Sequence, residues 1–240
     1  MFKTNIPLLV LAGGFGTRLQ TAVSEVPKAL APIANIPFLH YQIAHWLSQG
    51  LNSFVFLLHH QSYLIIQFLI TEQDALLKGC EVNWLVEPEP MDTGGAVAYA
   101  VEQLNLSDDF LLTNADTWLG DGIKQLLDAP SPAMAVVQVT DAARYGSVEL
   151  DEQNSVKAFH EKASISGAGF INAGLCLLHP ELFKNWDHKP FSLENVFFPV
   201  WAKSGILKAV KLNSDFIDIG VPEDYFRFCR WIESDKIIKL

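Results

Sequence analysis

Apolar and polar positions follow two different periods along this chain, and the pattern predicts an α/β fold. Short, continuous apolar runs are typical of buried strands, whereas apolar residues spaced three and four apart are typical of amphipathic helices. The pattern predicts strands over residues 6–11, 53–58, 80–86, 110–113, 146–150, 156–160, 170–178, 206–212 and 216–219, and helices over residues 37–49, 63–70, 95–104, 193–203 and 223–233.

The order of these elements changes near residue 140. Before it, strands and helices alternate with short connections, which predicts a Rossmann-like, mostly parallel sheet with helices on both faces. After it, the runs 146–150 and 156–160 flank a polar segment and predict a hairpin within a smaller β-rich region. The sequence has no repeat, charge run or low-complexity stretch. We therefore expect a single domain over residues 1–240, with a change of character near residue 140.

Composition narrows the possible partners and the compartment. Half of the 240 residues are hydrophobic, and the formal net charge is −10, which argues against a nucleic-acid-binding surface. Cys80, Cys176 and Cys229 are odd in number and widely spaced, so a disulfide framework or zinc site is not expected and a reducing, cytoplasmic location is. The apolar run near the N-terminus is too short to span a membrane, and we expect no membrane partner.

A glycine-rich segment directly follows the first predicted strand. Gly13, Gly14 and Gly16 can turn backbone N–H groups toward an anion, while Arg18 and Lys28 add positive charge. The segment lacks the G-K-[ST] ending of a P-loop and the third glycine of a dinucleotide fingerprint. The residues therefore predict a phosphate site of another type, although a glycine-rich turn without a ligand is the alternative.

This segment resembles the sugar-1-phosphate nucleotidyltransferases, in which a strand leads into G-G-x-G-T-R-L and then P-K-x-L. The resemblance extends in the family's order from Leu8 to Tyr225 and implies the nucleotide-diphospho-sugar transferase fold. It also implies a mainly nucleotide-binding half at residues 1–140 and a mainly sugar-phosphate-binding half at 141–240. The nucleotide-binding residues that it implies are Leu11, Ala12, Gly13, Gly14, Gly16, Thr17, Arg18, Lys28, Glu87, Thr93, Gly94 and Asn114.

The segment from Glu87 to Gly95 precedes a predicted helix and resembles the family's base-binding element. Backbone N–H groups at Thr93 and Gly94 would then face a base or ribose. Asp92 occupies a position where the family more commonly has glycine. A plain helix N-cap with a tight turn is the alternative.

Two aspartates follow apolar strands about a hundred residues apart. Asp116 resembles the family's magnesium aspartate, and Asp218 belongs to the string FIDIGVPEDY, which is specific for the family. Mg²⁺ prefers one or two carboxylates together with substrate phosphates, so the resemblance and the chemistry agree on Asp116 and Asp218 as metal ligands. A turn-forming role is the alternative for each aspartate taken alone.

Three further elements resemble the sugar-phosphate side of the family. They are Y-G at Tyr145 and Gly146, F-x-E-K ending at Glu161 and Lys162, and N-A-G beginning at Asn172. The resemblance implies that Gly146, Glu161 and Asn172 contact sugar hydroxyls and that Lys162 contacts the sugar's phosphate. An ordinary solvated ion pair is the alternative for Glu161 and Lys162.

The resemblance implies conversion of an NTP and a sugar 1-phosphate to an NDP-sugar and pyrophosphate, with Mg²⁺ as cofactor. The implied catalytic residues are Arg18, Lys28, Asp116, Asp218 and Lys162. Within the family, the strings DTGGAVAYA, INAGLCLL and FSLENVFFP resemble the D-glycero-α-D-manno-heptose 1-phosphate guanylyltransferases, which implies GTP as donor and a product for surface polysaccharide. Mannose 1-phosphate guanylyltransferase and N-acetylmuramate 1-phosphate uridylyltransferase are alternatives.

Two hypotheses from other classes follow from the same residues. One is a catalytically silent relative that binds a nucleotide-sugar and regulates a partner, although the expected arginine, lysine and aspartates are all present. The other is a nicotinamide oxidoreductase, although the glycine spacing does not fit one. The sequence leaves the oligomeric state open, including a homo-oligomer.

Overall fold

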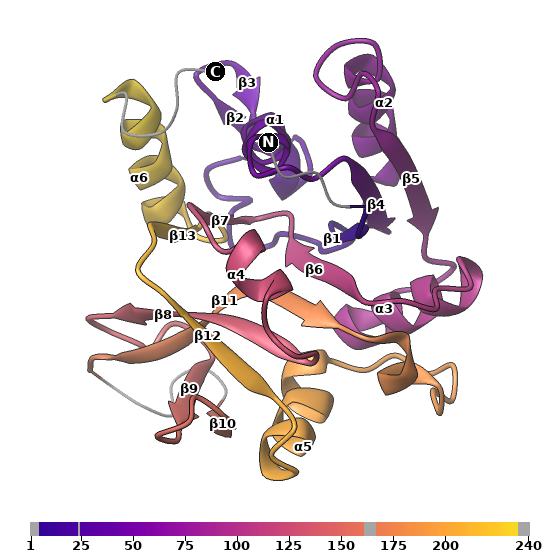
Figure 1. Cartoon of the computed structure of the whole chain (residues 1–240). Helices are drawn as coiled ribbons and strands as arrows, with labels where there is room; N and C mark the ends of the chain where they lie inside the picture. Colours follow the sequence, from indigo (N-terminus) through magenta and orange to yellow (C-terminus); the bar gives the residue numbers. More distant parts are fainter. Residues whose placement is uncertain (1–4, 24, 161–166, 235–240) are drawn as a thin grey trace. The chain divides into compact units, whose positions relative to one another are not determined.

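The computed structural model (Figure 1) describes residues 5–23, 25–160 and 167–234. These residues divide into two compact units. The first unit combines residues up to 88 with residues 114–118 and the segment from 216 onward. The second contains residues 89–113 and 119–215. Because the two units interleave along the chain, their boundaries do not coincide with the division expected near residue 140.

The first unit is built on three parallel strands, β1 (Leu8–Leu11), β4 (Ser53–Leu58) and β5 (Glu81–Val86), with β4 in the middle. Its helices are α1 (Phe38–Ser48), α2 (Ser62–Glu72) and α6 (Pro222–Glu233), each within two residues of its predicted bounds. Strand β13 (Phe216–Asp218) confirms the strand predicted over residues 216–219. Its partner β7 (Thr117–Leu119) and the pair β2 (Pro32–Ile33) with β3 (Ile36–Pro37) were not predicted. A short 3-10 turn, Lys28–Leu30, precedes β2.

A single apolar cluster joins α1, α6, β7 and β13 in the first unit. Phe38 of α1 and Phe228 of α6 are fully buried, with ring centroids 4.8 Å apart. Trp118 of β7 and Ile217 and Ile219 around β13 belong to the same cluster. Burying these side chains fixes β7, which Asp116 directly precedes, and β13, which ends at Asp218.

The second unit is mainly antiparallel, as the change of pattern after residue 140 predicts. Its longest strand, β11 (Gly169–Leu178), pairs antiparallel with β6 (Phe110–Asn114), β8 (Ala133–Val139) and β9 (Ser147–Leu150). The predicted hairpin is β9 with β10 (Val156–His160), and β12 (Lys208–Leu212) runs parallel to β8. The helices are α3 (Asp92–Gln103), α4 (Ile123–Leu127) and α5 (Phe198–Lys203), the last preceded by a π-turn at Leu193–Phe197; a 3-10 turn, Pro180–Phe183, follows β11.

These elements confirm the predicted Rossmann-like α/β class with a β-rich region. In the second unit, the helix expected from residue 95 begins at Asp92, and neither β8 nor α4 was predicted. Within the described ranges, no helix has the length and apolar character needed to cross a membrane.

Candidate active site

The glycine-rich loop follows β1 and is hydrogen-bonded to the end of β4 and to the residues just after it. Ala12 N–H donates to Leu57 C=O at 2.9 Å, and His60 N–H donates to Gly13 C=O at 3.2 Å. A Cβ at Gly13 would lie 2.8 Å from Glu87 Oε1, so a side chain there would collide with a buried carboxylate. Gly13 and Glu87, both predicted to bind nucleotide, are therefore neighbours at the carboxyl ends of β1 and β5.

The loop then passes beside Lys28. Gly16 has a φ of 62°, a left-handed conformation that favours glycine, and a Cβ on it would lie 3.3 Å from Lys28 Cβ. Arg18 is exposed, and its positive charge acts on Lys28 to oppose protonation. Thr17 is also exposed, and the space beside Gly14 is open. The loop thus presents Gly14, Thr17 and Arg18 to solvent next to the lysine.

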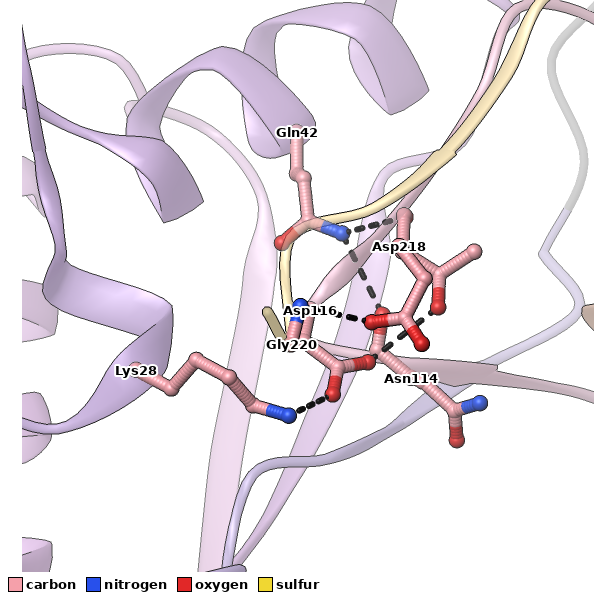
Figure 2. Close-up of polar contacts among 7 residues, drawn as sticks. Lys28, Gln42, Asn114, Asp116, Asp218 and Gly220 are labelled. Atoms are coloured by element: carbon pink, nitrogen blue, oxygen red, sulfur yellow. Dashed lines mark hydrogen bonds and ion pairs between the residues drawn. The ribbon is translucent and has the colours of Figure 1, made fainter. Parts of the chain in front are cut away.

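Lys28, Asp116 and Asp218 form one charged group, shown in Figure 2. Lys28 Nζ makes an ion pair with Asp116 Oδ2, and Thr117 Oγ1 donates to Asp116 Oδ1 at 3.1 Å. Gly220 N–H donates to Asp218 Oδ1 at 2.7 Å. Three of the residues predicted to carry catalysis therefore lie together, and Arg18 is exposed on the neighbouring loop. Lys162, with Glu161, lies outside the described residues.

Local sequence explains how the two aspartates reach this group. Asp218 lies between Ile217 and Ile219, both fully buried, so strand alternation turns its carboxylate away from the apolar cluster. Asp116 lies in the two-residue link between β6 and β7. Ala115 N–H donates to Leu11 C=O at 3.0 Å, and Ile219 N–H donates to Asp116 C=O at 2.9 Å. The link is thus bonded to β1 and to the end of β13.

The three groups perturb one another's protonation. Burial acts to lower the pKa of Lys28, but the charges of Asp116 and then Asp218 outweigh it and raise that pKa. Burial acts to raise the pKa of Asp116, but the Lys28 ammonium outweighs it and lowers that pKa. Burial, followed by the negative charge of Asp116, raises the pKa of Asp218. Lys28 and Asp116 are consequently both charged at neutral pH.

The donor set fits a magnesium ion that arrives with phosphate. Within residues 5–23, 25–160 and 167–234, no cluster of three or more His, Cys, Asp or Glu side chains is arranged to hold a metal. Asp116 and Asp218 instead supply two carboxylates, and Mg²⁺ takes one or two of these with phosphate oxygens and water. Asp116 accepts bonds from Lys28 and Thr117, fewer than the about four that a carboxylate can accept.

In the second unit, Thr93 and Gly94 are engaged by protein rather than open. Gly94 N–H donates to Phe191 C=O at 2.8 Å, and Thr93 Oγ1 donates to Glu194 Oε2 at 2.6 Å. A Cβ on Gly94 would lie 2.1 Å from the Phe191 ring. The Gly94 N–H expected to face a base is therefore already bonded. Asp92 has a φ of 57°, which explains why glycine suits its position.

Also in the second unit, the predicted sugar-binding residues Gly146 and Asn172 lie together. Asn172 N–H donates to Gly146 C=O at 3.1 Å, and Asn172 Oδ1 accepts from Gly174 N–H at 2.9 Å. Pairing of β11 with β8 shifts register after Asn172, and Gly174 has a φ of 74°. Tyr145 is half-buried, with the Arg144 guanidinium carbon 5.7 Å from its ring centroid. The N-A-G element is thus an irregularity in a long strand.

Sequence reasoning missed three residues of these groups. Gln42, from α1, donates hydrogen bonds on both sides of Asp116, and its only local sign is a polar residue inside an apolar helix. Gly220 packs so closely that a Cβ would lie 3.2 Å from Lys28 Nζ. Glu194 accepts from Thr93 and from Ser192 Oγ, at 2.8 Å for the latter.

Comparison with known sequences identifies relatives over most of the chain. A family model described as Nucleotidyl transferase matches residues 8–234. D-glycero-alpha-D-manno-heptose 1-phosphate guanylyltransferase from Campylobacter jejuni is 32% identical over 92% of this chain and 97% of its own length. Mannose-1-phosphate guanylyltransferase catalytic subunit beta from Drosophila pseudoobscura pseudoobscura is 30% identical over 94% of this chain, which spans 62% of that relative.

Comparison with solved structures agrees. The crystal structure of HddC from Yersinia pseudotuberculosis is 32% identical, with a TM-score of 0.84 over 95% of this chain and 99% of that one. A second structure of HddC, complexed with GMP-PN, matches with a TM-score of 0.83 and 31% identity over the same shares. The glycine loop, the charged group and these likenesses together identify the chain as a member of the nucleotidyl transferase family and, within it, as a sugar-1-phosphate nucleotidyltransferase.

Proposed function

We propose that this enzyme converts GTP and D-glycero-α-D-manno-heptose 1-phosphate to GDP-heptose and pyrophosphate, for the synthesis of a surface polysaccharide. The observation that carries the chemistry is the Lys28, Asp116 and Asp218 group beside the glycine loop. Support for the substrates comes from the Campylobacter jejuni relative, which matches over 97% of its own length, and from the GMP-PN complex of HddC.

The proposed reaction is an in-line displacement at the α-phosphorus. An oxygen of the sugar phosphate forms the new P–O bond, the bond between the α-phosphorus and its bridging oxygen breaks, and pyrophosphate leaves with that electron pair. A phosphate monoester is nucleophilic at neutral pH, so no general base is required. Catalysis is then positioning together with neutralisation of charge.

The chain's own residues divide this work. Arg18 binds the leaving pyrophosphate through its guanidinium fork, and Lys28 neutralises the triphosphate. Lys162, outside the described residues, is assigned to the incoming phosphate, and Asn172 with Gly146 to the sugar. Mg²⁺ held by Asp116 and Asp218 would supply further positive charge to the phosphate oxygens. The backbone near Gly13 and the carboxylate of Glu87 are assigned to the nucleoside.

Mannose 1-phosphate is the second candidate for the acceptor. The observation that favours it is the set of mannose-1-phosphate guanylyltransferases at 28–32% identity to this chain. This chain spans only 62–64% of the length of those relatives. Both candidates share GTP as the donor.

We assign the enzyme to the cytoplasm. The supporting observation is that Cys80, Cys176 and Cys229, all within the described residues, form no disulfide, as expected in a reducing compartment.

The testing experiment measures pyrophosphate release by the purified protein with Mg²⁺. It crosses GTP, UTP, CTP, ATP and dTTP with heptose, mannose, glucose and N-acetylmuramate 1-phosphates, with EDTA controls. EDTA-sensitive release confined to GTP and the heptose phosphate is the expected result. Release with mannose 1-phosphate would replace the acceptor, and binding without release from any pair would favour a silent regulatory relative.

A further inference from the structure

Gln42 is a buried polar residue between Tyr41 and Ile43 in α1. Its side chain is 1% exposed, and most of α1 around it is buried. The amide nitrogen Nε2 donates to Asn114 C=O at 3.2 Å and to Thr117 C=O at 2.8 Å (Figure 2). These carbonyls lie on either side of the Ala115-Asp116 link, so one side chain spans the link that carries Asp116.

The chemistry of this contact requires an amide. Two carbonyl oxygens need two N–H donors, which a glutamine NH₂ supplies without bringing a charge into the interior. A glutamate carboxylate would face the carbonyls with lone pairs only, and an apolar side chain would leave both carbonyls without these bonds. The amide can face the carbonyls in one orientation only, because its oxygen cannot donate.

This arrangement leaves the other end of the same amide unsatisfied. Gln42 Oε1 is buried and accepts no hydrogen bond from the part of the chain that the structure describes. A buried acceptor without a donor is destabilising, and such groups are uncommon in folded proteins. The side chain therefore donates both bonds to the segment around Asp116 while its own oxygen accepts none. Unfavourable local features of this kind are expected at functional sites.

The rest of the link is bonded through its backbone. Ala115 N–H binds Leu11 C=O, and Asp116 C=O accepts from Ile219 N–H. Gln42 adds the remaining support from α1, and it reaches the two residues that flank this pair. Since Thr117 Oγ1 also donates to Asp116 Oδ1, movement of Thr117 would move the carboxylate as well.

We propose that Gln42 is a positioning residue for Asp116, holding the Ala115-Asp116 link so that its carboxylate faces Lys28 and the phosphate site. The proposal rests on the proposed function in taking Asp116 as the residue that serves the reacting phosphates. Gln42 touches neither substrate nor metal and acts through the backbone of Asn114 and Thr117.

The test replaces Gln42 by methionine, which has a similar length but no donor. Loss of a supporting partner of a metal-ligating residue costs about 10- to 100-fold in activity or metal affinity. We expect Gln42→Met to lower kcat by that factor and to raise the Mg²⁺ concentration for half-activation, with little change in KM for the sugar phosphate. The matched control is Tyr41→Phe, which removes a buried donor to Ile33 C=O at 3.2 Å from the adjacent residue of α1. Its kcat should stay within about twofold of wild type.

A second readout needs neither metal nor substrate. Amide hydrogen exchange at Ala115 and Ile219 reports the bonds that hold the link, and both amides should exchange faster in Gln42→Met than in Tyr41→Phe. Unchanged exchange, or faster exchange with unchanged kcat and Mg²⁺ dependence, would overturn the positioning role.

Two further measurements keep the outcomes separate. Near-normal turnover by Asp116→Asn would contradict the proposed function, while the exchange data would still report on the link. If Gln42→Met fails to fold, hydrogen exchange of the Gln42 side-chain amide is measured in the wild-type protein instead. Slow exchange supports the two hydrogen bonds from Nε2 and with them the positioning role. Exchange as fast as that of a surface glutamine contradicts it.

Discussion

Glycine and hydrogen bonds have different roles in two regions: the charged group of the first unit and the start of α3 in the second unit. Around Lys28, close packing at Gly16 and Gly220 brings backbone up to charged side chains. Around Gly94, close packing brings backbone up to the Phe191 ring, and the neighbouring polar groups bond one another. The first arrangement leaves carboxylate and guanidinium groups available for ligands, whereas the second fixes a shape.

The difference shows that two glycine-containing motifs, similar in sequence, can have different structural roles. Both the G-G-x-G loop and the T-G-G segment were expected to offer N–H groups to a nucleotide. The structure shows the Gly94 N–H bonded to Phe191, while the space beside Gly14 is open. Substitutions in the two regions should consequently change different quantities: catalysis in the first, and folding stability in the second.

The largest effect is expected from Asp116→Asn, which keeps the shape of the side chain but removes the charge that pairs with Lys28. Turnover should fall by about a thousandfold, because Asp116 is proposed to hold the Mg²⁺ that would neutralise phosphate charge. Pyrophosphate release measures turnover, and circular dichroism checks folding. Asp74→Asn, at an exposed position, is the control and should keep wild-type activity. Turnover near wild type in Asp116→Asn would remove Asp116 from the mechanism.

Gly94→Ala tests the tightly packed region. Its Cβ would lie 2.1 Å from the Phe191 ring, so we expect a loss of about 1–3 kcal/mol in the free energy of unfolding from overpacking. Urea denaturation measures the loss, and Phe191→Ala in the same chain should recover part of it. Gly14→Ala, which has open space beside it, should leave stability nearly unchanged. Equal stability of Gly94→Ala and wild type would show that the Phe191 ring moves aside without destabilising the fold.

Asn172→Ala, in the second unit, tests the proposed contact between Asn172 and the sugar. Loss of one hydrogen bond to a sugar hydroxyl should raise KM for the sugar phosphate about tenfold and leave KM for the NTP unchanged. Steady-state kinetics with each substrate varied in turn measures both values. Asn83→Ala, at an exposed position of β5, serves as the control. A change in KM for the NTP instead would move Asn172 to the nucleotide side.

The smallest expected effect is a change in stability with pH, caused by Tyr225 in the apolar cluster of the first unit. Burial, and then the nearby Cys229, raises the pKa of Tyr225 to about 12, and its hydroxyl donates to Pro32 C=O at 2.5 Å. Above pH 10 the unfolded state releases this proton and the folded state retains it, so stability is complete below pH 10 and falls as the pH rises toward 12. We expect a loss of about 1–2 kcal/mol in the free energy of unfolding, since solvent reaches part of the ring.

Denaturation at pH 9 and pH 11.5 measures this loss. Tyr225→Phe should be less stable at pH 9, because it lacks the bond to Pro32, but should show a smaller decline with pH. Identical slopes for the two proteins would assign the decline to other groups.

The sequence was sufficient where local pattern and chemistry coincide. Asp116 and Asp218 each follow an apolar strand, and strand ends gather ligand-binding side chains, so their meeting could be predicted. The helix over residues 37–49 was predicted for a similar reason, because its apolar spacing is strong. The start of α3 could not be predicted, since it depends on Phe191 and Glu194, about a hundred residues away.

Gln42 and β8 show two other limits. A buried glutamine has no local pattern, because its partners at Asn114 and Thr117 are brought to it only by the tertiary fold. Strand β8 is a run of five buried residues followed by Gln138 and Val139, and its place beside β11 and β12 depends on pairing rather than on periodicity. Glu161 and Lys162 stay predictions from resemblance.

The link at Ala115-Asp116 has a consequence for how the enzyme is made. Its bonds come from Leu11, Gln42 and Ile219, which lie near the beginning, in the first quarter and near the end of the chain. A ribosome therefore has to release β13 before the link can be completed. A nascent chain without β13 therefore has Lys28 and Asp116 but lacks both Asp218 and the bond from Ile219, and it acquires the complete charged group only after β13 has been made.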